Sequence, residues 1–237
     1  VPDERLDKLT EMYKPEKTTH AVIEFVDIAG LVKGASRGEG LGNKFLSHIR
    51  ETDAIVEVVR CFEDSNVVHV DGSVNPLRDI DTINLELIFA DIETVNKRLD
   101  KARKNLKADK KYQLEIDLLE RILEALESGK SARTLDFNDE EQSMVKEMFL
   151  LTTKPILYVA NVSEEQLENA EQDENVQKVK QYAAEEGAEV VPLCVKMEEE
   201  LSGLDDEDKK EMLAMYNLDE SGLDKVVKKS YDLLGLM

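Results

Sequence analysis

The chain has 237 residues, of which 31 are lysine or arginine and 52 are aspartate or glutamate. The formal net charge of −21 argues against sequence-specific DNA binding and against nucleic-acid binding over the whole surface, although a local basic patch stays compatible with it. Two cysteines without metal-ligand spacing, and no apolar run of about 18 to 20 residues, exclude a disulfide framework and a membrane span, so we expect a cytoplasmic protein.

Short apolar runs rich in valine and isoleucine predict four strands, at 21–26, 54–61, 155–160 and 188–193. The runs are continuous rather than alternating, which is typical of parallel strands covered on both faces. Predicted helices lie between and after them, at 43–50, 175–186 and 222–234. This alternation of strand and helix predicts an α/β fold with a doubly wound, mostly parallel sheet.

One segment interrupts the alternation with a helical repeat. From Leu85 to Leu106 apolar residues recur at spacings of three and four, and the pattern returns from Tyr112 to Leu126. It predicts an antiparallel helical hairpin that turns within 107–111, and at about 1.5 Å per residue the first helix would project roughly 35 to 40 Å. The expected parts are a first half of the sheet domain, an inserted antiparallel coiled-coil arm and a second half of the sheet domain, at 1–79, 80–132 and 133–237.

The far half of this hairpin is basic. Between Lys97 and Lys111 only two acidic residues interrupt the basic ones, which are Lys97, Arg98, Lys101, Arg103, Lys104, Lys107, Lys110 and Lys111. A charge run of this kind is often a solvated helix face. It also fits an arm that contacts a polyanion such as ribosomal RNA, and both interpretations stay open.

The end of the first predicted strand carries the pattern Asp-x-x-Gly, from Asp27 to Gly30, followed by a glycine-rich loop. Nucleotidases use this pattern because a carboxylate at a strand tip can reach the water shell of Mg²⁺, and the glycine peptide can turn toward the terminal phosphate. The nearest match to a phosphate-binding loop, at 129–131, has Glu124 where a glycine is required and follows a helix instead of a strand. The chain therefore carries a switch motif without the loop that would hold the phosphates.

A second motif follows the predicted strand at 155–160. Guanine-specific nucleotidases have Asn-Lys-x-Asp at this place, and this chain has Asn161, Val162 and Glu164. The longer glutamate leaves guanine specificity in doubt, and a polar strand end that caps the next helix is the alternative. His69 lies in a polar loop and could reach a bound phosphate, although a lone histidine is more often structural.

These motifs together resemble one protein family. The stretches 27–46 and 49–54, the run Val59-Arg60-Cys61-Phe62-Glu63, the inserted arm and the run Asn161-Val162-Ser163-Glu164 are similar to the Obg-related translation-factor GTPases. They are most similar to the YchF / Obg-like ATPase subfamily, over essentially the whole chain. The resemblance implies a P-loop NTPase-type fold and a magnesium-dependent hydrolase that prefers ATP to GTP, acting in a ribosome-associated or stress-related process.

The resemblance also implies roles for individual residues. Asp27 would lie in the outer shell of Mg²⁺, and Gly30 would donate its amide to the terminal phosphate. Leu31 stands where many relatives have a water-orienting glutamine, so the catalytic group is expected elsewhere and His69 matches the proposed candidate. The implied base-binding residues are Asn161, Val162, Glu164, Cys194 and Val195, and the implied switch loop contains Leu31, Gly34, Gly38, Gly40 and Gly42.

Members of this family begin with a strand and a phosphate-binding loop, and they end in a small TGS domain. This chain begins at Val1 and ends at Met237, so we expect a fragment that does not hydrolyse ATP alone. We also expect an unfilled place in its sheet, between the strands at 21–26 and 54–61. Two alternatives stay open, which are a GTP-specific enzyme and a hydrolysis-incompetent scaffold whose basic arm docks on a partner.

Overall fold

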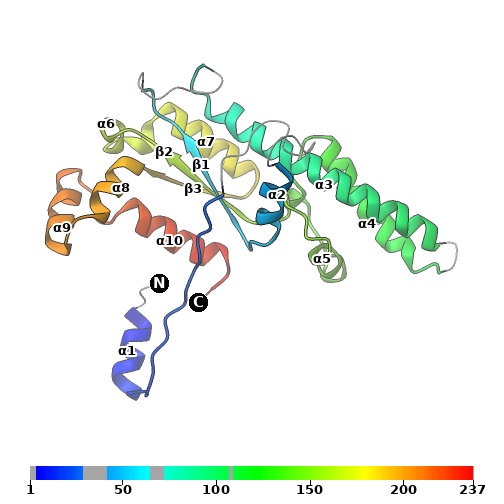
Figure 1. Ribbon diagram of the computed structural model, residues 1–237, viewed down its shortest axis with the longest axis horizontal. Helices are drawn as coiled ribbons and strands as arrows, with labels where there is room; N and C mark the ends of the chain where they lie inside the picture. Colours follow the sequence, from blue (N-terminus) through cyan, green and yellow to red (C-terminus); the bar gives the residue numbers. More distant parts are fainter. Residues whose placement is uncertain (1–3, 29–41, 65–71, 107–108, 237) are drawn as a thin grey trace.

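The computed structural model describes residues 4–28, 42–64, 72–106 and 109–236 (Figure 1). The strands are β1 (Ile55–Arg60), β2 (Ile156–Asn161) and β3 (Glu189–Leu193). The α-helices are α1 (Glu4–Tyr13), α2 (Gly42–Arg50), α3 (Pro76–Leu106), α4 (Tyr112–Glu127), α5 (Asp139–Lys146), α6 (Glu164–Leu167), α7 (Glu174–Glu185), α8 (Val195–Ser202), α9 (Asp206–Met215) and α10 (Gly222–Leu233). Two short 3₁₀ turns complete the described elements, η2 (Ala132–Thr134) and η3 (Ala170–Gln172).

The described strands form one parallel sheet in the order β1-β2-β3. Ile55 lies opposite Ile156 across the first pair of strands, and Leu157 lies opposite Glu189 across the second. Helices α3 and α7 cover one face of the sheet, and α10 covers the other (Figure 1). The predicted α/β class with a parallel sheet buried between helices is therefore confirmed.

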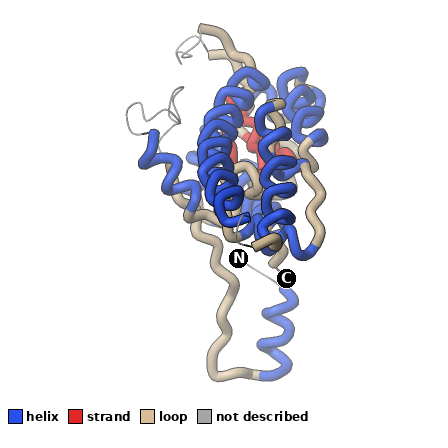
Figure 2. Tube along the Cα trace, turned by 90° about the vertical axis from the view of Figure 1, so that its right-hand side faces the viewer, coloured by secondary structure: helices blue, strands red, loops and turns tan. Residues whose placement is uncertain are grey.

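The strand predicted at 21–26 is wrong. These residues form no regular structure and belong to an extended segment that links α1 to the rest of the molecule (Figure 2). Val22 is 85% exposed, and the side chains of Phe25 and Val26 are also exposed. A strand forms only where a neighbour completes its backbone hydrogen bonds, and neither strand pairing of the described sheet includes this segment.

The helices predicted at 43–50, 175–186 and 222–234 are confirmed as α2, α7 and α10. Helix α7 begins where the side chain of Asp173 accepts hydrogen bonds from the backbone N–H groups of Asn175 and Val176. This cap satisfies donors that have no partner inside the helix. The chain then turns into β3 at Gly187, whose φ of 68° favours glycine.

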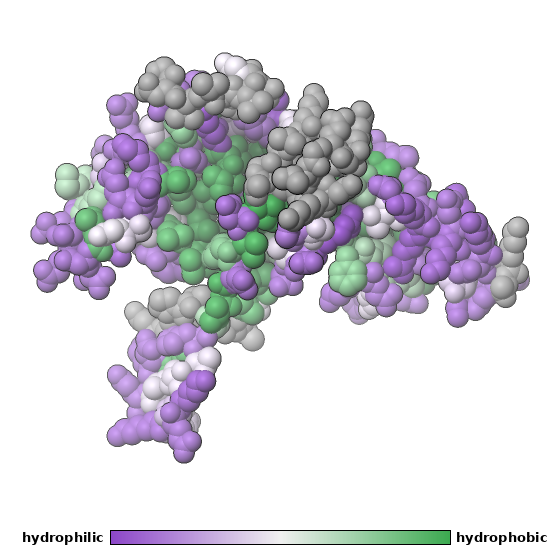
Figure 3. All heavy atoms as spheres, viewed as in Figure 1, coloured by the Kyte–Doolittle hydropathy of each residue, from purple (hydrophilic) through white to green (hydrophobic). Residues whose placement is uncertain are grey.

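The predicted hairpin is confirmed as the antiparallel pair α3 and α4, whose ends at Leu106 and Tyr112 agree with the expected turn. The first half of α3 packs on the sheet, and the second half extends beyond it with α4 (Figure 1). Val95 and Leu99 of α3 are buried against Leu119 of α4 and its neighbours. The outer surface of this arm is hydrophilic, whereas apolar residues gather over the sheet (Figure 3). The arm is thus continuous with the helix that covers the sheet.

Candidate functional site

The carboxyl ends of β2 and β3 bring the predicted base-binding residues together. Asn161 ends β2, and its side-chain Oδ1 accepts a hydrogen bond of 3.1 Å from the backbone N–H of Val195. The backbone N–H of Val162 donates to the carbonyl of Leu193 at 2.9 Å, and its side chain is buried. Because parallel strands end at the same edge, residues 31 and 34 positions apart meet here.

Glu164 lies at the first position of α6, after Ser163 has capped the helix. Its Oε1 forms an ion pair of 2.7 Å with Nζ of Lys196 on α8, and this hydrogen bond raises the pKa of Lys196. The carboxylate is therefore partly engaged by a lysine in the first turn of α8. Both side chains reach solvent, so the pair leaves the carboxylate accessible to a ligand.

Cys194 and Val195 form the opposite wall of this edge. Cys194 is the residue before α8 and is buried, whereas Val195 is 44% exposed. Five predicted base-binding residues consequently lie at the ends of two neighbouring strands: Asn161, Val162, Glu164, Cys194 and Val195. The Asn161 amide, the exposed side chain of Val195 and the Glu164 carboxylate lie at one sheet edge, where they can contact the edge and face of a planar base.

The phosphate side of the predicted site falls largely outside the described residues. His69, Gly30, Leu31, Gly34, Gly38 and Gly40 belong to this group, whereas Gly42 is the first residue of α2. Asp27 is described and its side chain is exposed. Among the described residues no group of three histidine, cysteine or acidic side chains could hold a metal. A single carboxylate fits Mg²⁺ in nucleotide sites, where phosphates and water supply the other ligands.

The end of β1 is fastened to the same edge. The backbone N–H of Cys61 donates to the carbonyl of Asn161 at 2.8 Å, and Nε2 of Gln166 donates both to the Cys61 carbonyl at 3.3 Å and to Asp173 at 2.7 Å. Burial raises the pKa of the Cys61 thiol to about 12. This cysteine therefore stays protonated and holds structure instead of acting as a nucleophile.

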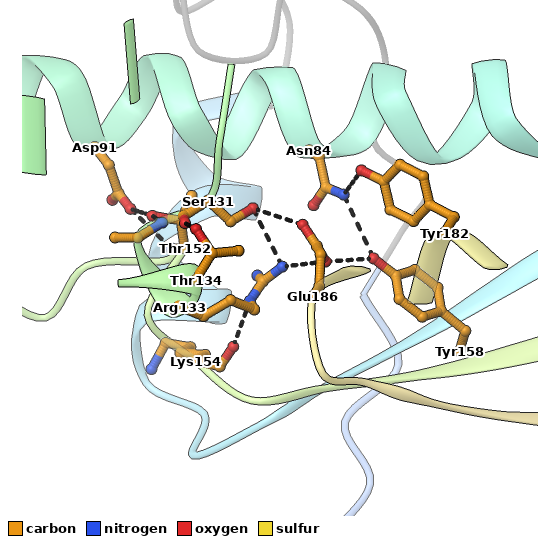
Figure 4. A network of polar contacts seen from close by, with 11 residues as sticks. Asn84, Asp91, Ser131, Arg133, Thr134, Thr152, Lys154, Tyr158, Tyr182 and Glu186 are labelled. Carbon is orange, nitrogen blue, oxygen red and sulfur yellow. Dashed lines mark hydrogen bonds and ion pairs between the residues drawn. The ribbon is translucent and has the colours of Figure 1, made fainter. Parts of the chain in front are cut away.

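A second polar cluster, which we did not predict, lies where the arm joins the sheet (Figure 4). Glu186, which follows α7, accepts hydrogen bonds from three groups: Nη1 of Arg133 at 2.9 Å, the hydroxyl of Tyr158 at 3.0 Å and the hydroxyl of Ser131 at 3.1 Å. Nδ2 of Asn84 on α3 donates to the hydroxyl of Tyr158 at 3.4 Å and to that of Tyr182 at 3.0 Å. We call Asn84, Ser131, Arg133, Tyr158 and Glu186 the arm-root cluster.

Glu57 of β1 borders the arm-root cluster. Burial is the main cause that raises its pKa to about 8, Arg133 opposes the rise, and Glu186 adds to it. Its Oε2 is buried without a hydrogen-bond partner, as is Nη2 of Arg133. One signal in the sequence pointed here, because Glu57 is a charged residue inside the apolar run from Ile55 to Val59. Arg133 and Glu186 carried no such signal.

A cavity of about 430 Å³ lies at the amino ends of β2 and β3. Its walls include Leu135, Val145, Ile156 and Leu233 together with the Arg133 and Glu186 side chains. It is therefore at the opposite end of the strands from the predicted base-binding edge and next to the arm-root cluster. A nucleotide at the carboxyl ends of the strands would not reach it.

Acidic neighbours neutralise half of the predicted basic residues of the arm. The pairs are Lys97–Glu93, Arg98–Glu115, Arg103–Glu120 and Lys111–Asp109. Lys101, Lys104 and Lys110 are exposed and form no ion pair within the described part of the chain. Lys107 lies outside the described residues. The uncompensated positive charge of the arm is thus concentrated in fewer residues than the sequence indicated.

Comparisons with known proteins point to one family. A family model described as "50S ribosome-binding GTPase" matches residues 6–97. The chain is 54% identical over 237 residues to "Ribosome-binding ATPase YchF" of Bacillus subtilis and 46% identical to the protein of that name from Escherichia coli O157:H7, covering 100% of this chain and 65% and 64% of those proteins. The solved structure of the Schizosaccharomyces pombe YchF GTPase matches with a TM-score of 0.82 and 37% identity, over 99% of this chain and 64% of that one.

The chain thus spans slightly less than two thirds of the length of these relatives. Within the described residues no helix is both long enough and apolar enough to cross a membrane.

Proposed function

The chain belongs to the YchF family of P-loop proteins, and from this premise we propose that it forms the base-binding and arm-bearing part of a magnesium-dependent ATPase that acts on the ribosome in the cytoplasm. The observation that carries this proposal is the meeting of Asn161, Val162 and Glu164 with the segment before α8. Relatives are named both as ATPase and as GTPase, so the identity of the base is the main question.

Adenine is the base that this edge fits better. Guanine recognition by Asn-Lys-x-Asp depends on an aspartate whose two oxygens accept from N1 and N2 of the base. In this chain the corresponding carboxylate belongs to Glu164, is one methylene longer, and already accepts from Lys196. Val162 stands in place of the lysine of that motif, and its side chain is buried in the core instead of facing the edge. The Glu164 carboxylate is therefore not positioned as the guanine motif requires for accepting from N1 and N2 of the base, and ATP is the proposed substrate.

Hydrolysis would transfer the terminal phosphoryl group to water by positioning and electrostatic stabilisation. Asn161 and Val195 would hold the base, and Gly30 would donate its amide to the terminal phosphate. Asp27 would face the water shell of Mg²⁺, which when bound neutralises charge on the phosphates. His69 would orient the attacking water, because the side chain of Leu31 cannot polarise it.

Calorimetry on the full product of the gene tests the choice of base. We expect ATP to bind more tightly than GTP, and Glu164→Asp to bring the two affinities closer, because it shortens the carboxylate toward the guanine motif. Glu165→Asp is the matched control, since this neighbour is exposed and Lys196 pairs with Glu164 instead. GTP binding that equals or exceeds ATP binding in the unmodified protein would overturn the proposal for adenine.

The catalytic assignment has a separate test. His69→Ala should lower the turnover of ATP while the affinity for the nucleotide stays the same, because the imidazole would act on water and not on the base. An unchanged turnover would remove His69 from the mechanism.

A second function, docking of the arm on a polyanion, is favoured by the exposed lysines that form no ion pair with any described residue. Lys101 and Lys104 lie three residues apart on α3, so they share one face of the arm. The expected partner is ribosomal RNA, in keeping with relatives named for ribosome binding. This function would not require hydrolysis, so it also describes the scaffold alternative.

Charge reversal tests the docking. Lys101→Glu combined with Lys104→Glu should weaken binding to purified ribosomes and reduce the salt dependence of the remaining binding, because fewer counterions are released. The control is Lys209→Glu combined with Lys210→Glu on α9, which changes the net charge equally at a distance from the arm. If both double variants bind ribosomes equally well, the basic run is a solvated helix face and not a docking surface.

A further inference from the structure

The arm-root cluster joins helix α3, the chain that returns from the arm, and the end of α7. Asn84 and Asp91 hold the sheet-covering half of α3 at two points, seven residues apart. Asp91 is buried and accepts hydrogen bonds from the backbone N–H groups of Leu151 at 2.9 Å and Thr152 at 2.7 Å, and from the Thr152 hydroxyl at 2.7 Å. The helix that leaves the body as the arm is therefore fixed to the segment that enters β2.

The chain returning from the arm is fixed at the same place. The backbone N–H of Arg133 donates to the carbonyl of Thr152 at 2.9 Å, and its Nε donates to the carbonyl of Lys154 at 3.0 Å. Its guanidinium then reaches Glu186 (Figure 4). The side chains of Arg133 and Glu186 are only 6% and 10% exposed, so the pair is insulated from salt and water. Loss of either partner would leave a buried charge uncompensated.

Helix α7 runs from this pair to the base-binding edge. The amino end of α7 is capped by Asp173, which also accepts a hydrogen bond from Gln166. Gln166 in turn donates to the carbonyl of Cys61 at the end of β1. The carboxyl end of α7 leads directly into Glu186. A helix of 12 residues is a stiff rod of about 18 Å, so a displacement at one end moves the other.

The pair also has an alternative arrangement within reach. Oε2 of Glu57 and Nη2 of Arg133 are both buried without a hydrogen-bond partner, and the charge of Arg133 acts on Glu57. On losing its proton, Glu57 would offer Arg133 a second carboxylate, so the guanidinium could exchange Glu186 for Glu57 while remaining buried. A pair with two discrete partners can carry coupling between distant sites, whereas a uniformly packed core cannot.

We propose that Arg133 and Glu186 form the joint through which α7 transmits occupancy of the base-binding edge to the orientation of the arm. Both residues are positioning residues, since neither lies at the base-binding edge. The inference rests on the proposed nucleotide site, and it makes the arm a reporter of nucleotide state instead of a passive projection.

Distance measurements by electron paramagnetic resonance test this joint in the full product of the gene. Spin labels at Lys104→Cys on the arm and Asp232→Cys on α10 report the orientation of the arm, because the native cysteines 61 and 194 are buried. We expect a non-hydrolysable ATP analogue to shift this distance. The double variant R133M/E186L should lose the shift while it still binds the analogue in calorimetry, since replacing both partners leaves no unpaired charge.

The exposed arm pair provides the matched control, because R103M/E120L removes an Arg–Glu pair that does not touch α7. It should keep the shift. If R133M/E186L does not fold, as judged by circular dichroism, Arg133→Lys keeps the charge but loses the forked donor geometry and should reduce the shift. Two results would overturn the proposed coupling through Arg133 and Glu186. One is a full distance shift in the Arg133 variants, and the other is no shift in the unmodified protein although it binds the analogue. Absence of nucleotide binding in calorimetry instead refutes the proposed function.

Discussion

Glu57 should make the stability of this protein depend on pH in an unusual direction. Its pKa rises from 4.5 to about 8 in the fold, mainly because the carboxyl group is buried. Between these two values the folded state holds a proton that the unfolded chain releases, so the folded state binds more protons. The free energy of unfolding should therefore fall as the pH rises from about 4.5 to about 8.

The magnitude follows from the same two values. A rise from 4.5 to about 8 corresponds to about 5 kcal/mol, at about 1.4 kcal/mol for each pH unit. This is an upper limit for the cost of Glu57 at alkaline pH, because β1 lies at the edge of the described sheet and opening there can admit water. Glu57→Gln keeps the shape of the side chain and removes its titration. The variant should therefore exceed the stability of the unmodified protein by a small margin near pH 5 and by a much larger one near pH 8.

Urea unfolding at pH 5, 6, 7 and 8, followed by circular dichroism, measures this difference. The quantity that decides is the free energy of unfolding of Glu57→Gln minus that of the unmodified protein, which should grow with pH. The subtraction removes the contribution of other buried acids such as Asp91, whose pKa burial also raises. Glu207→Gln on α9 removes one exposed acidic charge and should show no such growth. A difference for Glu57→Gln that stays constant over this range would refute the assignment of a buried, protonated carboxyl group.

Three further predictions concern stability and binding. Gly222→Ala should destabilise the fold by about 1 to 3 kcal/mol in urea unfolding, because an added Cβ would lie 2.4 Å from Cβ of Leu193. Gly203→Ala is the control and should be nearly neutral, because its added Cβ would have its nearest contact at 3.6 Å. Asp91→Ala should lower the unfolding free energy by about 2 to 4 kcal/mol, since three donors lose their acceptor. A loss no larger than that caused by replacing an exposed acidic residue would contradict this. Asn161→Ala should weaken ATP binding in calorimetry and lower the thermal midpoint, because its Oδ1 also holds the start of α8; unchanged affinity would remove it from the base site.

The meeting of the proposed base-binding residues at one edge could be predicted because several of them follow one another along the chain. Asn161, Val162 and Glu164 come directly after a buried strand, and parallel strands end at a common edge, so local order implies a spatial arrangement. The ion pair between Glu164 and Lys196 joins residues 32 positions apart. Its geometry depends on how α6 and α8 leave the sheet, which no sequence pattern specifies.

The arm-root cluster could not be predicted for a related reason. Arg133 follows the arm, Tyr158 lies in β2 and Glu186 follows α7, so their contact depends on the packing of three elements. A buried charge looks like any surface charge in a sequence unless it interrupts an apolar run, as Glu57 does. Periodicity identifies which residues avoid water, but it does not pair the polar residues that are buried with them.

The contrast between residues 21–26 and 54–61 shows why local composition cannot decide that a strand forms. Both runs are short, apolar and rich in β-branched residues, yet only the second contains a strand, because β2 lies beside it and completes its hydrogen bonds. The first has no paired neighbour among the described residues and leaves Val22 and Phe25 exposed. Strand propensity mainly measures how well a side chain fits a half-buried surface. A neighbouring strand must supply that surface, so any segment that pairs beside 21–26 should convert it into a protected strand.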